Sequence, residues 1–308
     1  MNLKINIAGV TFKNPVWPAS GTFGHGEDFT DFFDINKLGA IVTKTITLNE
    51  RVGNPTPRIV ETPSGMLNAI GLENKGLKGF INETAPFLKK VKTRIVISVA
   101  GSTQTELEEC VLELLKNYIP DAIEINLSCP NVQHKGTKTR LFSQDADTVK
   151  TIVKSIKKKT KEKCLLISKL TPNVTDISAI AQAAEQGGSD AVSLVNTYLG
   201  MKIDINKKKP FLGNIQGGLS GPAIRPMAVR AVWDTYKTIK IPIIGMGGIM
   251  TGPDALEFIL AGATSIQVGT ANFINPTATI NVLEGIEEYL KGNKEKNIKT
   301  LVGAAQNI

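Results

Sequence analysis

Short runs of apolar residues, rich in valine and isoleucine, recur along the chain at intervals suited to β-strands. Between them lie longer segments whose apolar positions repeat with helical spacing. In residues 105–117, Leu107, Val111 and Leu114 fall on one face, and residues 145–159 have an acidic start and a lysine-rich end, as stable helices do. The candidate strands are residues 16–19, 40–43, 95–99, 122–125, 165–169, 191–195, 241–245 and 265–268.

Eight strands that alternate with helices predict an α/β fold, a single (β/α)8 TIM barrel over residues 1–308. The length suits one such domain, which typically takes roughly 250 residues plus insertions. A doubly wound open sheet is the main alternative, but no Gly-x-Gly-x-x-Gly follows the first strand. Connections 45–75 and 197–221 are too long for simple crossovers, and we expect lid insertions after strands 2, 4 and 6.

Composition narrows the class of protein. Hydrophobic residues make up 42% and charged residues 21%, which predicts a large buried core. The formal net charge is +8, and the lysines lie in helix-like or terminal stretches without interleaved aromatic residues. A solvated basic surface is therefore favoured over nucleic-acid binding. The chain has no apolar run of about 18 residues and no signal-peptide layout at its N-terminus, so we expect a cytoplasmic protein without a membrane segment.

The cysteines and histidines argue against two kinds of structural site. Cys110, Cys129 and Cys164 form no paired pattern, which disfavours a disulfide framework, a zinc ribbon, and a [2Fe–2S] cluster that normally needs four thiolates. His25 and His134 have no second ligand at metal spacing. We therefore expect no metal in this chain.

Polar residues follow or end several of the apolar runs, and in a barrel the carboxyl ends of the strands converge on one face. Two lysines and two asparagines in one pocket would offer cations and amide groups to a flat, electron-rich or anionic ligand. A Schiff-base aldolase that uses Lys169 is an alternative for such a site. The polar residues are Ser20, Lys44, Asn126 and Asn196, which follow their runs, Lys169, which ends one, and Ser98, which lies near the end of another.

Glycine turns follow the last two strands. The segments 245–249 (Gly-Met-Gly-Gly-Ile) and 269–271 (Gly-Thr-Ala) leave backbone N–H groups exposed. In barrels of this type, the last two strand-to-helix loops usually bind a phosphate. Together they predict a phosphate site.

One cysteine stands apart from the other two. Cys129 lies in Asn-Leu-Ser-Cys-Pro-Asn, just past the fourth strand, where a thiol is accessible and can act as a base or nucleophile. Cys110 and Cys164 lie in a helical pattern and at a strand edge, positions typical of structural cysteines. We predict that Cys129 carries the reacting group.

Several ordered motifs resemble those of the dihydroorotate dehydrogenases. They are Asn-Pro-x-x-x-Ala-Ser-Gly (14–21), Gly-Asn-Pro-x-Pro-Arg (53–58), Asn-Ala-Ile-Gly-Leu (68–72), Val-Ala-Gly-Ser (99–102), Asn-Leu-Ser-Cys-Pro-Asn (126–131), Gly-Gly-Leu-Ser-Gly-Pro (217–222), Gly-Met-Gly-Gly-Ile (245–249) and Val-Gly-Thr-Ala (268–271). They span nearly the whole chain. The cysteine resembles class 1, and the motifs at 68–72 and 218–222 resemble its NAD-linked subclass, 1B.

The resemblance implies a reaction and its partners. It implies FMN-dependent oxidation of (S)-dihydroorotate to orotate in de novo pyrimidine (UMP) biosynthesis, with Cys129 removing the C5 proton and hydride passing from C6 to FMN N5. It also implies a homodimer core and a partner subunit with FAD and a [2Fe–2S] cluster, in a heterotetramer that passes electrons to NAD+. A related dihydropyrimidine dehydrogenase of the dihydrouracil type is the alternative.

The resemblance also assigns ligand contacts. Two departures from the subclass are Ser98, where an asparagine is usual, and the Gly-Thr-Lys-Thr-Arg-Leu-Phe-Ser loop after Cys129, which is less glycine-rich than usual. The implied FMN contacts are Ser20, Lys44, Thr45, Ser98, Asn126, Lys169, Val195, Gly221, Gly247, Gly248, Gly269 and Thr270. The implied substrate contacts are Lys44, Asn68, Ala69, Ile70, Gly71, Leu72, Asn126, Asn196 and Thr197.

Overall fold

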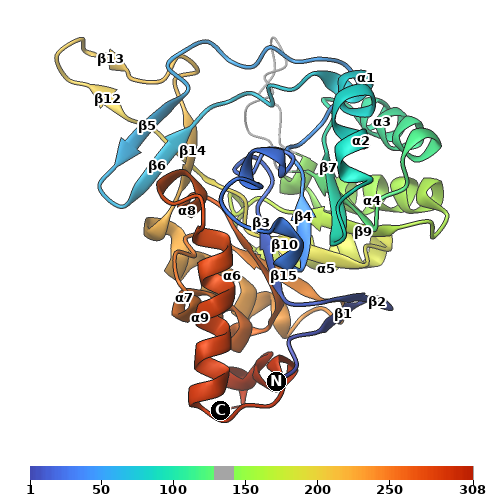
Figure 1. The fold of residues 1–308 in the computed structure, drawn as a ribbon. Coiled ribbons are helices and arrows are strands. Elements are labelled where there is room, and N and C mark those ends of the chain that lie inside the picture. The colour runs from blue at the N-terminus through green and yellow to red at the C-terminus, as the bar shows by residue number, and fades with distance from the viewer. Residues whose placement is uncertain (128–141, 308) are drawn as a thin grey trace.

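A computed structural model describes residues 1–127 and 142–307, which are built around eight parallel strands (Figure 1). Their hydrogen-bonded order is β3-β16-β15-β10-β9-β8-β7-β4, so each strand pairs with its sequence neighbour within the barrel. The two end strands also meet, because the Gly39 N–H donates to the Val16 carbonyl at 3.0 Å. All eight predicted strands and the TIM barrel are confirmed. The strands are β3 (Val16–Pro18), β4 (Ala40–Val42), β7 (Arg94–Val99), β8 (Ala122–Asn126), β9 (Leu165–Lys169), β10 (Ala191–Leu194), β15 (Ile243–Met246) and β16 (Ala263–Val268).

Helices occupy the connections between the strands and surround the sheet (Figure 1). The α-helices are α1 (Gly76–Gly79), α2 (Ala85–Leu88), α3 (Gln104–Asn117), α4 (Ala146–Thr160), α5 (Ile177–Gly187), α6 (Arg225–Tyr236), α7 (Gly252–Ala261), α8 (Ala271–Ile274) and α9 (Ala278–Gly292). A π-helical turn, η3 (Phe80–Thr84), joins α1 to α2. Short 3-10 turns are η1 (Glu27–Phe29), η2 (Ile35–Lys37), η4 (Phe142–Gln144), η5 (Pro222–Ile224), η6 (Ile298–Leu301) and η7 (Ala304–Gln306).

The two helices predicted in detail, α3 and α4, are confirmed, and side-chain caps set where they begin. The Thr103 hydroxyl accepts from the Glu106 N–H at 3.1 Å, and the Asp145 carboxylate accepts from the Thr148 N–H at 2.8 Å. Each cap satisfies an N–H that has no partner within the helix. The apolar face of α4, including Val149 and Ile156, is buried as its periodicity predicts.

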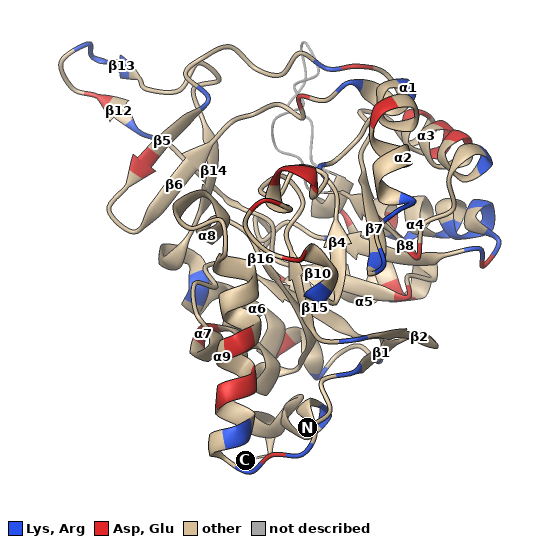
Figure 2. Ribbon diagram, viewed as in Figure 1, with Lys and Arg blue, Asp and Glu red and all other residues tan. Residues whose placement is uncertain are grey.

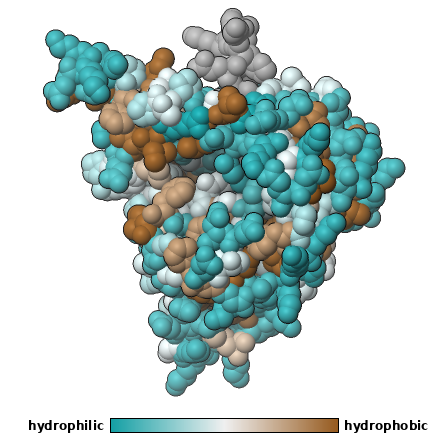
Figure 3. Space-filling model, turned by 45° about the horizontal axis from the view of Figure 1, so that its top comes forward, coloured by the Kyte–Doolittle hydropathy of each residue, from teal (hydrophilic) through white to brown (hydrophobic). Residues whose placement is uncertain are grey.

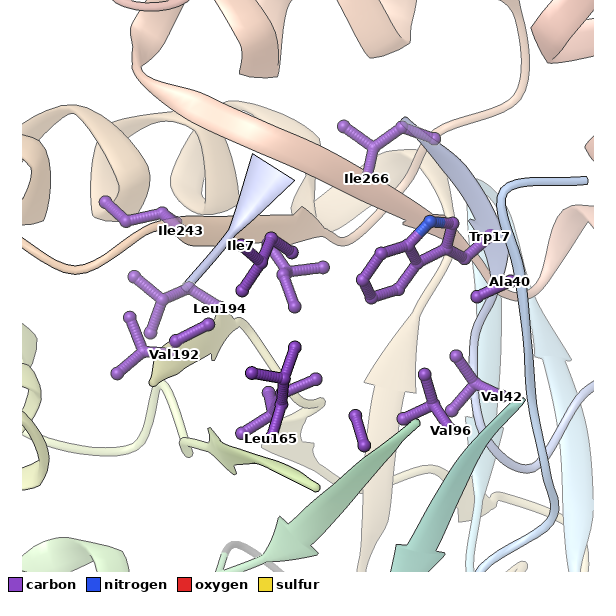
Figure 4. Close-up of a cluster of buried hydrophobic side chains, with 14 of the residues drawn as sticks. Ile7, Trp17, Ala40, Val42, Val96, Leu165, Val192, Leu194, Ile243 and Ile266 are labelled. Carbon is purple, nitrogen blue, oxygen red and sulfur yellow. The ribbon is translucent and has the colours of Figure 1, made fainter. Parts of the chain in front are cut away.

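Apolar side chains from the strands fill the core (Figure 4). Trp17, Val42, Val96 and Leu165 come from four different strands and turn toward one another, and all are at most 7% exposed. Full burial of one such side chain stabilises the fold by about 1.5–3 kcal/mol. A hairpin that the sequence did not predict, β1 (Ile5–Ile7) and β2 (Val10–Phe12), adds three buried side chains to this core.

The two long connections form a second sheet that the sequence did not predict. Antiparallel strands pair in the order β11-β14-β6-β5, and this insertion sheet stands beside the upper end of the barrel in Figure 1. Gly65 is required there, because a Cβ at this position would lie 2.0 Å from the Ser220 carbonyl oxygen. A hairpin projects beyond the sheet. The strands are β5 (Ile59–Thr62), β6 (Gly65–Asn68), β11 (Tyr198–Gly200), β14 (Gly217–Ser220) and, in the hairpin, β12 (Ile203–Asp204) and β13 (Lys209–Pro210).

Lysines and arginines are interspersed with acidic residues on the outer helices and loops (Figure 2). On α4, Lys157 contacts Asp190 at 2.7 Å and Lys159 contacts Glu108 at 2.9 Å. Part of the lysine-rich stretch is therefore locally compensated. In the described residues, no helix combines the length and the apolar character that crossing a bilayer requires.

Candidate active site

A pocket of about 410 Å³ lies where the carboxyl ends of the barrel strands meet the insertion sheet. Its volume falls within the roughly 300–1,000 Å³ range of small-molecule sites. Five of the six predicted strand-end residues line it: Ser20, Lys44, Asn126, Lys169 and Asn196. The convergence inferred from the strand ends is thus present in the structure.

Most of the other predicted contact residues also line this pocket. They are Thr45, Asn68, Ile70, Gly71, Leu72, Val195, Thr197, Gly221, Gly247, Gly248, Gly269 and Thr270. Ser98 and Ala69 do not. The Ser98 hydroxyl lies 2.8 Å from the Thr45 hydroxyl, and Ala69 is buried in a small cluster with Leu67 and Leu212. Cys129 lies outside the described residues.

The two lysines have different environments. Lys169 is 4% exposed, and its Nζ donates to Ser20 Oγ at 3.0 Å and lies 3.7 Å from Glu124 Oε1. Lys44 is only partly buried, and it forms no ion pair with any residue in the described ranges. Lys44 therefore offers an uncompensated cation to an anionic ligand, whereas the charge of Lys169 is already paired.

The asparagines link the carboxyl ends of β8 and β10, which lie on either side of β9, and also contact the insertion sheet. Asn196 Nδ2 donates to Asn126 Oδ1 at 3.4 Å, and Asn196 Oδ1 accepts from the Thr197 N–H at 2.9 Å. Asn68 Nδ2 donates to the Gly218 carbonyl at 3.3 Å. These bonds restrict the side-chain rotamers, so amide donors and acceptors are preorganised around the pocket.

Glycines shape the part of the pocket beyond β15 and β16. Gly247 and Gly248 have φ of +126° and +79°, and a Cβ on Gly248 would lie 2.8 Å from Arg225 Cβ. Gly269 differs, because a Cβ there would make only ordinary contacts, at 3.6 Å to Ala19 and 4.0 Å to Thr22. Gly269 borders the pocket, so it leaves space beside the exposed backbone for a ligand.

Sequence reasoning missed two buried polar residues of this site, Glu124 and Gln267. Both have zero exposure, and Gln267 lines the pocket. Gln267 Nε2 donates to Glu124 Oε2 at 2.9 Å. A detectable signal was the glutamate in the middle of an otherwise apolar strand, since a buried carboxylate needs partners. Apolar residues of the pocket that were also missed include Ile59, Met66, Met246 and Phe273.

The two described cysteines are poor candidates for chemistry. Burial raises the pKa of Cys110 to about 12 and that of Cys164 to about 11. A thiol with so high a pKa is protonated at neutral pH and is neither a base nor a good nucleophile. Within residues 1–127 and 142–307, no cluster of three His, Cys, Asp or Glu side chains could hold a metal ion.

Comparison with known proteins gives a consistent set of similarities. The family model described as dihydroorotate dehydrogenase matches residues 2–290. The chain is 51% identical over 304 residues to the dihydroorotate dehydrogenase B (NAD(+)) catalytic subunit of Alkaliphilus metalliredigens, with 99% of each chain covered. Proteins of the same description from Desulforamulus reducens and Bacteroides thetaiotaomicron are 50% and 49% identical, again over 99% of each chain.

Proposed function

The chain belongs to the dihydroorotate dehydrogenase family, and we propose that it is the catalytic subunit of an NAD+-linked enzyme with FMN in the barrel pocket. It oxidises dihydroorotate to orotate in pyrimidine biosynthesis. The proposal for the pocket rests on one observation. Lys44, Lys169 and Asn126 line the same pocket as the glycine turns after β15 and β16.

The pocket residues suit FMN. Gly247, Gly248, Gly269 and Thr270 would hold the phosphate, since backbone N–H groups of glycine turns bind anions well. Gln267 Oε1 is buried without a hydrogen-bond partner among the described residues, as expected for an acceptor that a ligand satisfies. When bound, FMN supplies the acceptor for the hydride that leaves the substrate.

Lys44 and the asparagines would bind the substrate. Dihydroorotate carries a carboxylate and ring amide groups, so an uncompensated cation and preorganised amides complement it. A site built to pair a substrate's polar groups strongly rejects an analogue that lacks one of them. Dihydrouracil, which has no carboxylate, should therefore be a poor substrate.

Cys129 is our proposed base for the C5 proton. It follows β8 by three residues, and the last residue of β8, Asn126, borders the pocket. The high pKa values of Cys110 and Cys164 leave no other cysteine suited to this role. Removing a proton from carbon needs the thiolate, which a nearby cation such as Lys44 would favour.

The test is anaerobic stopped-flow reduction of the bound flavin by dihydroorotate. Purified protein should be yellow, and Cys129→Ala should retain FMN but reduce it far more slowly. Cys164→Ala is the matched control, because it removes a buried thiol outside the pocket lining. A wild-type rate in Cys129→Ala would refute the base assignment, and a folded protein that takes up no FMN would refute the pocket assignment.

We further propose that electrons pass to NAD+ through a partner subunit that carries FAD and a [2Fe–2S] cluster, bound to a homodimer of this chain. Exposed apolar side chains support an interface near the insertion sheet, where Figure 3 shows apolar surface beside the projecting hairpin. They include Ile59, Leu199, Ile203, Phe273 and Ile274, each at least 45% exposed. Co-expression with a candidate partner should give a complex that reduces NAD+, whereas this chain alone should reduce only artificial dyes.

A further inference from the structure

Glu124 lies inside the barrel and organises three polar side chains from other strands. Its Oε2 accepts from Gln267 Nε2 at 2.9 Å and from Ser193 Oγ at 3.1 Å, and its Oε1 lies 3.7 Å from Lys169 Nζ. Glu124 has zero exposure, and it is absent from the lining of the pocket, whereas Gln267 and Lys169 line it. The buried Glu124 carboxylate thus contacts two pocket residues, Gln267 and Lys169, from the barrel interior.

The carboxylate determines which way the Gln267 amide points. An ionised carboxylate can only accept hydrogen bonds, so Gln267 must turn its NH2 group toward Glu124. The amide oxygen, Oε1, is then directed elsewhere, and it is buried with no hydrogen-bond partner among the described residues. Buried acceptors are rarely left unpaired, so we expect a ligand to donate a hydrogen bond to this oxygen.

We propose that Gln267 is a ligand-binding residue whose carbonyl accepts a ring N–H of the bound heterocycle, and that Glu124 is the positioning residue that enforces this orientation. The inference rests on the proposed function. The pyrimidine edge of FMN carries one N–H, N3–H, flanked by two carbonyl oxygens. The Lys169 ammonium can donate to a ring carbonyl, and the Gln267 carbonyl can accept from a ring N–H. Both side chains contact the same carboxylate, so they form a donor–acceptor pair that matches the adjacent carbonyl and N–H of this FMN edge.

The charge of Glu124 is essential to this role, and its volume is not. In Glu124→Gln the new amide can donate as well as accept, so it tolerates Gln267 in either orientation. The flipped orientation presents NH2 to the ligand N–H, which sets two donors against each other. The variant keeps the shape of the side chain, so its effect on binding reports the lost orientation rather than a cavity.

The first measurement is FMN affinity, obtained from quenching of flavin fluorescence as flavin-stripped protein is reconstituted. Gln267→Met, which preserves volume, should bind FMN about tenfold more weakly, and Glu124→Gln should bind it several-fold more weakly. Glu124→Asp retains the charge and should recover part of the loss. Ser193→Ala is the matched control, because it removes another donor to Glu124 but keeps the Gln267 bond.

The second measurement reads the hydrogen bond itself. With ¹⁵N-labelled FMN, the N3–H proton resonance should move upfield in Gln267→Met and Glu124→Gln but not in Ser193→Ala. A purely structural role for Glu124 would change the urea midpoint without moving this resonance. Wild-type protein should also bind 3-methyl-FMN at least tenfold more weakly than FMN, a comparison that needs no variant.

The outcomes separate this inference from the proposed function. If wild-type protein takes up no FMN, the proposed function fails first. If wild-type protein binds FMN, but Gln267→Met and Glu124→Gln bind it within twofold of wild type with an unmoved N3–H resonance, the inference is overturned. Equal affinity of wild type for FMN and 3-methyl-FMN overturns it as well.

Discussion

Replacing Lys169 with methionine should destabilise the protein mainly because it removes the cation beside the buried Glu124 carboxylate. The Nζ–Oε1 distance is 3.7 Å, and both side chains are at most 5% exposed. Two unit charges about 4 Å apart attract each other by about 4 kcal/mol at an effective dielectric constant of 20. Removing one partner of a buried pair usually costs about 3–5 kcal/mol. Ser193 and Gln267 still donate to Glu124, so we expect a loss of about 3 kcal/mol.

A double-mutant cycle tests the origin of this loss. Adding Glu124→Gln to Lys169→Met removes the unpaired charge, so the double variant should recover most of the stability, with a coupling of about 2–3 kcal/mol. Urea unfolding at several FMN concentrations, extrapolated to zero FMN, removes the contribution of flavin binding. If Lys169→Met costs the same with or without Glu124→Gln, charge pairing does not explain the stability of this network.

Three further predictions concern other parts of the chain. Burial, assisted by the charge of Lys44, lowers the pKa of His25 from 6.5 to about 4, so between these pH values only the unfolded chain binds the proton. The free energy of unfolding should therefore fall by up to about 3 kcal/mol as the pH drops from 6.5 to 4. His25→Phe should flatten this part of the profile of urea midpoint against pH. Gly269→Ala should keep the wild-type melting temperature but weaken FMN binding in a fluorescence titration, because its Cβ clashes with no protein atom yet borders the pocket. Cys110 and Cys164 should stay unmodified by iodoacetamide at pH 8 in native protein and react after unfolding, as peptide mass spectrometry can show.

Local patterns accounted for the barrel strands and for much of the pocket. Parallel strands buried on both faces are near-continuous apolar runs, so β4, β7 and β15 are visible in the sequence. The pocket residues at strand ends were predictable for the same reason, since the point where such a run stops is a local feature. Lys44 and Asn126 needed no tertiary information beyond the assumption of a closed barrel.

The insertion sheet could not be predicted in the same way. In this sheet, Gly218 pairs with Asn68, 150 residues away in the chain. Its strands are three or four residues long, and β6, β11 and β14 contain glycine, so neither length nor alternation marks them as strands. Their pairing partners exist only after the barrel has brought the two connections to the same end.

The hydrophobic periodicity of this chain thus specifies a barrel and the residues at its mouth, because strand identity depends on near neighbours. Glu124 and Lys169 lie on the adjacent strands β8 and β9, but the bond between Glu124 and Gln267 depends on closure, which brings β8 and β16 together across the barrel interior. Closure also places Ser98 behind Thr45 and puts Gln267 at the pocket. Side chains that meet across a barrel interior leave no periodic trace in the sequence, so their roles emerge only from the folded arrangement.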